Sequence, residues 1–105
     1  MIDGVATIRQ AILMLLSTRP GERVMRPEYG CSLYRLAFSP NDDTTAGLAE
    51  FYVREAIARW EPRVWDLRVN ASPDTEVRSI LLISLAYKLR DFAVSDAVTY
   101  PLRLS

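Results

Sequence analysis

Apolar residues recur at helical spacing in two parts of the chain. In the first part, from about residue 5 to 18, they form one stripe: Val5, Ile8, Ile12, Leu15 and Leu16. In the second part, from about residue 44 to 60, they form a stripe that Pro62 terminates: Ala49, Tyr52, Val53, Ala56, Ile57 and Trp60. The opposite side of this second stripe carries two pairs at ion-pair spacing, Glu50 with Arg54 and Glu55 with Arg59. The pattern predicts two amphipathic helices.

The segment between the two helices, residues 19–43, lacks this periodicity. Prolines and glycines punctuate it, and its charged residues flank short turns. We expect residues 31–38 to form a short helix that packs Leu33, Leu36 and Phe38 against the core. A loop of this length is unusual in a small domain, which indicates a role beyond connecting the helices.

After the second helix, apolar and polar positions alternate, which is the period of half-buried strands. Residues 63–71 place one set on the expected core face: Trp65, Leu67, Val69 and Ala71. Residues 77–89 do the same with another set: Leu81, Ile83, Leu85, Tyr87 and Leu89. After a polar break at residues 90–96, residues 98–104 form a third strand, which Pro101 confines to a sheet edge.

The order of these elements predicts an α+β fold: two main helices packed on a three-stranded antiparallel sheet, with a short helix in the long inter-helix loop. The 105 residues suit a single domain, 1–105. An unpaired sheet edge can accept a strand from another chain. Either outer strand could be the acceptor. If the proline side of the third strand faces outward, where Pro101 cannot donate a backbone hydrogen bond, the sequence favours the edge of the first strand.

The amino-acid composition argues against several classes of function. Lys and Arg number 13, Asp and Glu number 13, and there is no histidine. A net charge of zero gives no electrostatic reason to bind nucleic acid or an anionic membrane, and the lack of histidine removes the usual general base and metal ligand. The single cysteine, Cys31, cannot form an intramolecular disulfide, which fits a reducing compartment. The longest apolar run, residues 11–16, is far shorter than a membrane span.

Carboxylates are the remaining candidates for catalysis. Two carboxyl groups about 5 to 10 Å apart are what a glycosidase requires. The candidates lie beside arginines, loops or helix ends, where capping and solvated charge explain them: Glu22, Glu28, Asp42, Asp43, Glu61 and Asp66. We therefore expect no catalytic residue, no cofactor and no metal, and a peptidoglycan-cleaving, lysozyme-like enzyme ranks last among the functions considered.

The most informative motif is Trp60-Glu61-Pro62-Arg63, at the predicted boundary between helix and strand. Proline restricts the backbone there and so fixes the directions of Glu61 and Arg63, and rigid opposite charges suit docking to another protein. An ordinary proline stop flanked by surface charges is the alternative interpretation. Further candidate protein-binding residues lie in the loop after the first helix: Arg19, Glu22, Arg23 and Arg26.

In combination, several segments resemble one known family. They are the apolar stripe of the first helix, Pro20-Gly21-Glu22-Arg23, Arg26-Pro27-Glu28-Tyr29-Gly30, the Glu61-Pro62-Arg63 junction and the terminal strands. Their order and spacing resemble the baseplate wedge and sheath-initiator family of contractile phage tails, type VI secretion systems and extracellular contractile injection systems. This family also includes anti-adaptor regulators of the same fold.

The resemblance implies a non-enzymatic subunit that is assembled in the cytoplasm and becomes part of a baseplate. The implied partners are other wedge subunits, the sheath protein and inner tube or tube-initiator proteins, without nucleic acid or membrane. Glu61, Pro62 and Arg63 match the family's docking junction, and the sheet is expected to template the first sheath ring by strand addition. A regulatory protein-binding module is the alternative. Phage, secretion and injection particles remain equally open as the parent assembly.

Overall fold

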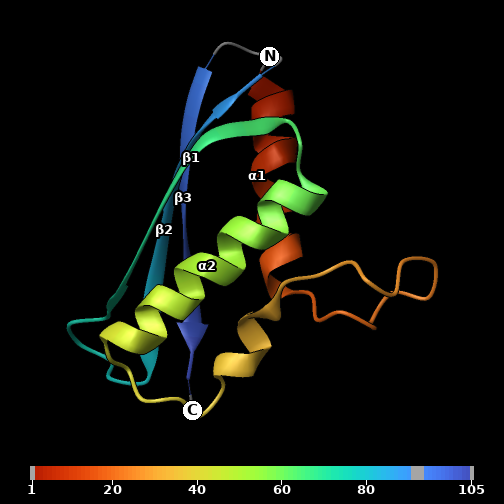
Figure 1. Ribbon diagram of the computed structural model, residues 1–105. Coiled ribbons are helices and arrows are strands. Elements are labelled where there is room, and N and C mark those ends of the chain that lie inside the picture. The colour runs from red at the N-terminus through yellow and green to blue at the C-terminus, as the bar shows by residue number, and fades with distance from the viewer. Residues whose placement is uncertain (1, 91–93, 105) are drawn as a thin grey trace.

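Two helices lie on one face of an antiparallel sheet in the computed structural model, which describes residues 2–90 and 94–104 (Figure 1). The elements in chain order are α1 (Ile2–Ser17), a 3-10 helix η1 (Ser32–Leu36), α2 (Asp43–Trp60), β1 (Val64–Pro73), β2 (Ile80–Leu89) and β3 (Val94–Arg103). The strands lie side by side in the order β1-β2-β3. The predicted α+β fold is confirmed.

The core forms where the apolar stripes of the helices meet the inner face of the sheet. Ile8 and Ile12 of α1 and Val53 and Ile57 of α2 are at most 2% exposed, so both predicted stripes are confirmed. Strand β2 contributes every second residue: Leu81, Ile83, Leu85, Tyr87 and Leu89. Helix α2 crosses the sheet obliquely over β1, and α1 packs beside β3 (Figure 1). Burial of each large apolar side chain contributes about 1.5–3 kcal/mol.

The boundaries of α2 follow from its flanking residues. Asp42 has an extended backbone, and its carboxylate accepts a hydrogen bond from the Thr45 N–H at 2.9 Å. This bond lowers the pKa of Asp42 and satisfies one of the free donors at the start of the helix. At the other end, Pro62 prevents Glu61 from continuing the helix.

The short helix in the loop is confirmed, but one of its three expected core residues is not. Leu33 and Leu36 are buried, whereas Phe38 is 86% exposed. Phe38 has a φ of +68°, and its N–H donates to the carbonyl of Leu104. The chain therefore turns at Phe38 to meet the residue after β3, and this turn directs the ring away from the core.

A β-bulge reverses the expected facing at the start of β1. Asp66 has a φ of +48°, and the register with β2 shifts beside it, so that two residues of β1 oppose one of β2. Before the bulge, Val64 is buried and Trp65 is 44% exposed; after it, Val69 and Ala71 are buried as expected. The prediction that Trp65 lies in the core is therefore wrong, because one additional residue moves side chains to the opposite face.

Strand β3 begins earlier than the sequence pattern indicated. It starts at Val94, which pairs with Leu89, rather than at residue 98. The predicted polar break at residues 90–96 therefore includes three strand residues, while its residues 91–93 lie outside the described part of the chain. The pattern missed the start of the strand because Asp96, a polar residue, lies on the core face opposite Tyr87.

Candidate functional site

The Glu-Pro-Arg junction connects α2 to β1, and its two charged side chains bind each other. Arg63 donates through Nε and Nη2 to the two carboxylate oxygens of Glu61, at 2.6 and 2.9 Å. The side chain of Glu61 is 7% exposed, whereas that of Arg63 is 43% exposed. Pro62 lies between them, and its carbonyl accepts a hydrogen bond from Arg90 Nε at 3.2 Å. The junction thus presents one partly exposed guanidinium, whose orientation is fixed by its two hydrogen bonds to a buried carboxylate.

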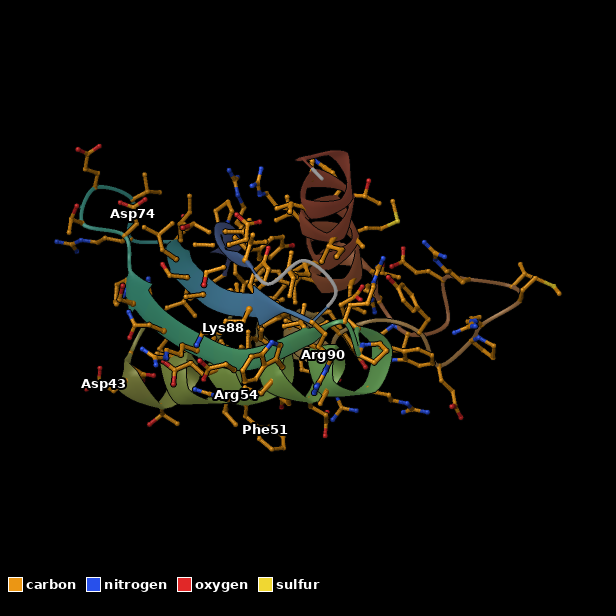
Figure 2. The ribbon with its side chains drawn as sticks, turned by 90° about the horizontal axis from the view of Figure 1, so that it is seen from above. Asp43, Phe51, Arg54, Asp74, Lys88 and Arg90 are labelled. Carbon is orange, nitrogen blue, oxygen red and sulfur yellow. The ribbon has the colours of Figure 1, made fainter. Side chains whose placement is uncertain are left out.

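The loop after α1 folds back on itself as an arm, residues 18–31, that projects from the body of the domain (Figure 2). Its base is closed by the Cys31 N–H, which donates to the carbonyl of Thr18 at 2.9 Å. Gly30 has a φ of +144°, and an added Cβ would lie 2.7 Å from the Thr18 oxygen and from Pro20 N. Only glycine fits this close approach of the two sides of the arm.

The arginines of the arm lie against aromatic rings. The Arg23 guanidinium is 4.5 Å from the centre of the Tyr29 ring, and that of Arg26 is 5.7 Å from the centre of the Trp60 ring. Arg19 lies 4.7 Å from a ring of η1, and its backbone N–H donates to the carboxylate of Glu22. Such contacts contribute about 0.5–1 kcal/mol each at exposed sites and restrict where the side chains can point.

Trp60 joins the arm to the junction. It directly precedes Glu61, and its ring meets that of Tyr29 edge to face at 5.4 Å. Arg59 lies 4.9 Å from the Trp60 ring and forms an ion pair with Glu28 of the arm. The structure thus brings the predicted loop arginines and the predicted junction to the same end of α2. Glu28, Tyr29 and Arg59 belong to this arrangement and were not predicted as site residues.

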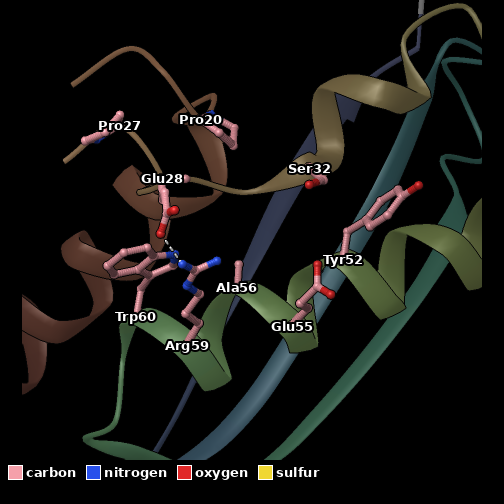
Figure 3. Close-up of a pocket in the computed structure, with 10 residues that line it drawn as sticks. Pro20, Pro27, Glu28, Ser32, Tyr52, Glu55, Ala56, Arg59 and Trp60 are labelled. Atoms are coloured by element: carbon pink, nitrogen blue, oxygen red, sulfur yellow. Dashed lines mark hydrogen bonds and ion pairs between the residues drawn. The ribbon is translucent and has the colours of Figure 1, made fainter. Parts of the chain in front are cut away.

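A groove of about 490 Å³ lies between the arm and α2 (Figure 3). Its walls combine proline, aromatic and charged side chains with backbone: Pro20, Pro27, Glu28, Gly30, Ser32, Tyr52, Glu55, Ala56, Arg59 and Trp60. Arg59 is paired with Glu28 on one wall, and Glu55 lies further along α2 (Figure 3). The groove is therefore open, mixed in polarity and bounded by the rigid base of the arm.

Side chains of α2 occupy the outer edge of β1. Glu50 accepts a hydrogen bond from the Ala71 N–H at 2.8 Å, and Arg54 donates to the carbonyl of Leu67 at 3.4 Å. Since these backbone groups point away from β2, they are the ones that an added strand would use. Glu50 and Arg54 therefore bond to β1 instead of pairing with each other, and Arg59 pairs with Glu28 instead of Glu55.

The outer edge of β3 is arranged differently. The Leu104 N–H donates to the carbonyl of Ser79 at 2.7 Å, and the pairing of β3 with β2 has no register shift. Even-numbered residues of β3 therefore bond to β2, and odd-numbered residues such as Thr99 direct their backbone groups outward. Pro101 is also at an outward position, where its missing N–H leaves the β2–β3 ladder intact.

One polar cluster on the core side of the sheet was not predicted. Asp96 accepts hydrogen bonds from the Tyr87 hydroxyl at 2.9 Å and from Arg9 Nε and Nη2 at 3.0 and 2.9 Å. The bond from Arg9 lowers the pKa of Asp96, and burial raises the pKa of Tyr87. The cluster ties α1 to both β2 and β3, so its role is structural.

Within residues 2–90 and 94–104, no three Cys, Asp or Glu side chains come together where a metal ion could bind. Over the same described ranges, neither α-helix combines the length and the apolar character that a membrane crossing requires. The junction, the arm and the sheet edges are thus the main surface features of a small α+β domain.

The chain belongs to the baseplate wedge protein gp25 family, whose sequence profile matches residues 3–93. One relative is the baseplate wedge protein gp25 of Enterobacteria phage T4, which is 34% identical over 70 residues. That alignment covers 67% of this chain and 53% of the phage protein, so the chain spans about half the length of this relative.

Two solved structures have the same fold. A candidate tail lysozyme from Geobacter sulfurreducens is 39% identical, with a TM-score of 0.87 over 97% of this chain and 92% of that one. A chain from the baseplate complex of the type VI secretion system is 14% identical, with a TM-score of 0.77 over 98% and 95% of the two chains. At this low identity, the second similarity establishes the fold alone.

Proposed function

We propose that this chain is a structural subunit of the inner baseplate of a contractile tail or injection system. It acts as one wedge-like domain over residues 1–105, docks on the wedge scaffold and templates the first ring of the sheath. The observation that carries this proposal is the match to the gp25 baseplate wedge family over residues 3–93. The subunit is assembled with its partners in the cytoplasm, and those partners are other wedge subunits, the sheath protein and inner tube or tube-initiator proteins.

The docking surface is formed by the junction and the base of the arm. Buried Glu61 orients the guanidinium of Arg63, which retains exposed surface for a partner. Trp60 holds the arm next to it, so residues distant in sequence form one rigid patch of arginines and aromatic rings. Aromatic residues and arginine are enriched where protein interfaces are strongest, which supports this assignment.

Sheath templating occurs by strand addition at the edge of β3. The edge of β1, which the sequence favoured, has its Ala71 N–H bonded to Glu50 and its Leu67 carbonyl bonded to Arg54. Strand β3 keeps an uninterrupted register, and its outward backbone groups from residue 95 to 99 precede Pro101. A strand from a sheath subunit would add there through backbone hydrogen bonds, with side-chain alternation setting its register.

The subunit acts without catalysis. Five of the six carboxylates considered from the sequence have structural bonds: Glu22 to the arm backbone, Glu28 to Arg59, Asp42 to the α2 N-terminus, Glu61 to Arg63 and Asp66 to Lys88. The sixth, Asp43, lies in the first turn of α2, where a negative charge is favourable. The Geobacter protein is described as a lysozyme. In this chain, each of the six carboxylates considered as catalytic candidates has a structural explanation instead.

The test is deletion of the coding sequence in the organism that makes the particle, followed by electron microscopy and mass spectrometry of purified particles. We expect wild-type particles to contain the chain, and the deletion to yield tubes or baseplates without sheath. A plasmid copy should restore the sheath, and an empty plasmid should not. Fully sheathed particles from the deletion strain would show that the proposed function is wrong.

A further inference from the structure

We infer that the tip of the arm, Val24 and Met25, inserts into an apolar pocket with an acidic rim on a neighbouring protein subunit. The two side chains are 94% and 90% exposed, more than any other large apolar side chain whose surface the structure describes. The inference rests on the proposed function for the assembly in which that neighbour occurs. It concerns a surface distinct from the Glu61–Arg63 junction and from the edge of β3.

The arm holds the tip in a defined position before any partner binds. The Gly21 N–H donates to the carbonyl of Pro27 at 2.7 Å, which closes the arm between its base and its tip. Arg23 is anchored by the Tyr29 ring and by Met14, whose sulfur is 3.0 Å from Arg23 Nη2. Because these contacts already hold the backbone of the arm, binding loses less backbone entropy than it would for a flexible loop.

The sequence around the tip sets the chemistry of the pocket. Arg23 and Arg26 directly flank Val24-Met25 in the sequence, so the exposed apolar pair lies between two positively charged residues of the arm. The complementary surface is a concave apolar pocket whose rim carries carboxylates, which would pair with the exposed edges of the two guanidinium groups.

A protein pocket fits this tip better than a lipid surface does. Interfacial membrane binding needs a broad apolar face with basic residues on its polar side, whereas the tip offers two side chains. Two side chains suffice when a shaped pocket surrounds them on all sides, because each is then fully removed from water.

The first experiment places a photo-crosslinking amino acid at Met25 in cells that assemble the particle, with the same group at Val77 as a control. Val77 is also exposed, at 44%, but lies in the turn between β1 and β2, remote in sequence from the arm. We expect position 25 to crosslink to one particle subunit, at a peptide with apolar residues next to Asp or Glu, and position 77 to give no such product.

The second experiment compares incorporation of the Val24→Ser/Met25→Ser variant with that of Val77→Ser, in competition with the wild-type chain. Loss of two buried apolar contacts should reduce incorporation of the double variant about 100-fold, while Val77→Ser incorporates normally. Both variants should unfold at the wild-type urea concentration, since the replaced side chains are exposed.

Three results would overturn the inference. If wild-type particles contain the chain but the tip gives no crosslink and the double variant incorporates normally, the inference is wrong and the proposed function stands. If purified particles lack the chain altogether, both are wrong. If the wild-type chain binds phosphatidylglycerol vesicles and the double variant does not, the tip is a membrane contact instead of a protein contact.

Discussion

Glu61 and Arg63 form a bidentate ion pair across Pro62. Two hydrogen bonds of 2.6 and 2.9 Å join the buried carboxylate to the partly exposed guanidinium. The carboxylate depends on this partner, because few water molecules reach it. The junction is consequently part of the fold as well as the proposed docking surface, so substitutions there should affect stability and, under the proposal, assembly.

Arg63→Ala should lower the free energy of unfolding by about 1–3 kcal/mol, since it leaves the buried Glu61 carboxylate without its bidentate partner. Arg63→Lys keeps the charge but not the two-pronged geometry, so it should fall between wild type and alanine. Urea denaturation of the three proteins measures this order. An unchanged midpoint for Arg63→Ala would mean that the pair contributes nothing to the fold.

Gly30→Ala should destabilise the arm more than Gly21→Ala. Both glycines have positive φ, +144° and +98°, but a Cβ on Gly30 would lie 2.7 Å from backbone atoms, whereas nothing lies within 4 Å of one on Gly21. We expect a loss of about 1 kcal/mol at Gly21 from backbone strain alone, and clearly more at Gly30. Equal losses in thermal unfolding would contradict the close packing of the arm's base.

Asp96→Asn should destabilise the domain by about 1–3 kcal/mol at neutral pH, because it weakens the bonds from Arg9 and Tyr87. The pKa of Asp96 is lowered in the folded state, so its ionised form stabilises the fold above the unfolded-state pKa of about 3.9. The difference between the two proteins should therefore be constant from about pH 6 to 8 and shrink as the pH falls below about 4. A difference that grows on acidification would contradict this linkage.

Thr99→Pro should leave the monomer folded and block sheath assembly, because the Thr99 N–H points outward from β3. Val98→Pro is the matched control: its N–H bonds to β2, so this variant should lose about 3 kcal/mol or more of stability. Circular dichroism reports folding, and electron microscopy of complemented particles reports the sheath. Normal sheaths built on folded Thr99→Pro would rule out strand addition at this edge.

The purified chain should not digest peptidoglycan. Glu28 and Glu55 line the same groove, which makes them the pair to test, yet Glu28 is held by Arg59. Turbidity of a cell-wall suspension should remain constant for the wild type, Glu28→Gln and Glu55→Gln alike. Steady digestion by the wild type that either substitution abolishes would falsify the non-enzymatic assignment.

The sequence correctly predicted the helices and strands in which one face is consistently apolar and the other consistently polar. Ile8 and Ile12 in α1, and Leu81 and Ile83 in β2, are buried as their periodicity indicated. The pattern failed where a core position is polar. Asp96 looks like a break between strands in the sequence, yet it lies on the inner face of the sheet, where Arg9 neutralises its charge.

Side-chain partners were harder to predict than side-chain positions. Their spacing on the helix predicts an ion pair between Glu50 and Arg54. Both side chains instead bond to the backbone of β1, which lies next to α2 only in the folded structure. Likewise, the sequence identified the arginines of the arm and the Glu61–Arg63 junction separately. Their convergence depends on Trp60, which the sequence placed in the helical stripe and beside the junction, but whose contacts with Tyr29 and Arg26 of the arm only the tertiary structure shows.

The bulge at Asp66 also changes the hydrogen-bonding phase along the edge of β1. Before it, the Arg63 carbonyl faces β2 and accepts from the Arg90 N–H, whereas after it the odd-numbered Ala71 faces away from β2. A regular strand alternates without interruption, so it cannot match both halves of this edge in a single alignment. Strand β3 has no such interruption. Under the proposed strand addition, the sheet would therefore extend at the edge of β3 alone, which would give the assembly built on it a direction.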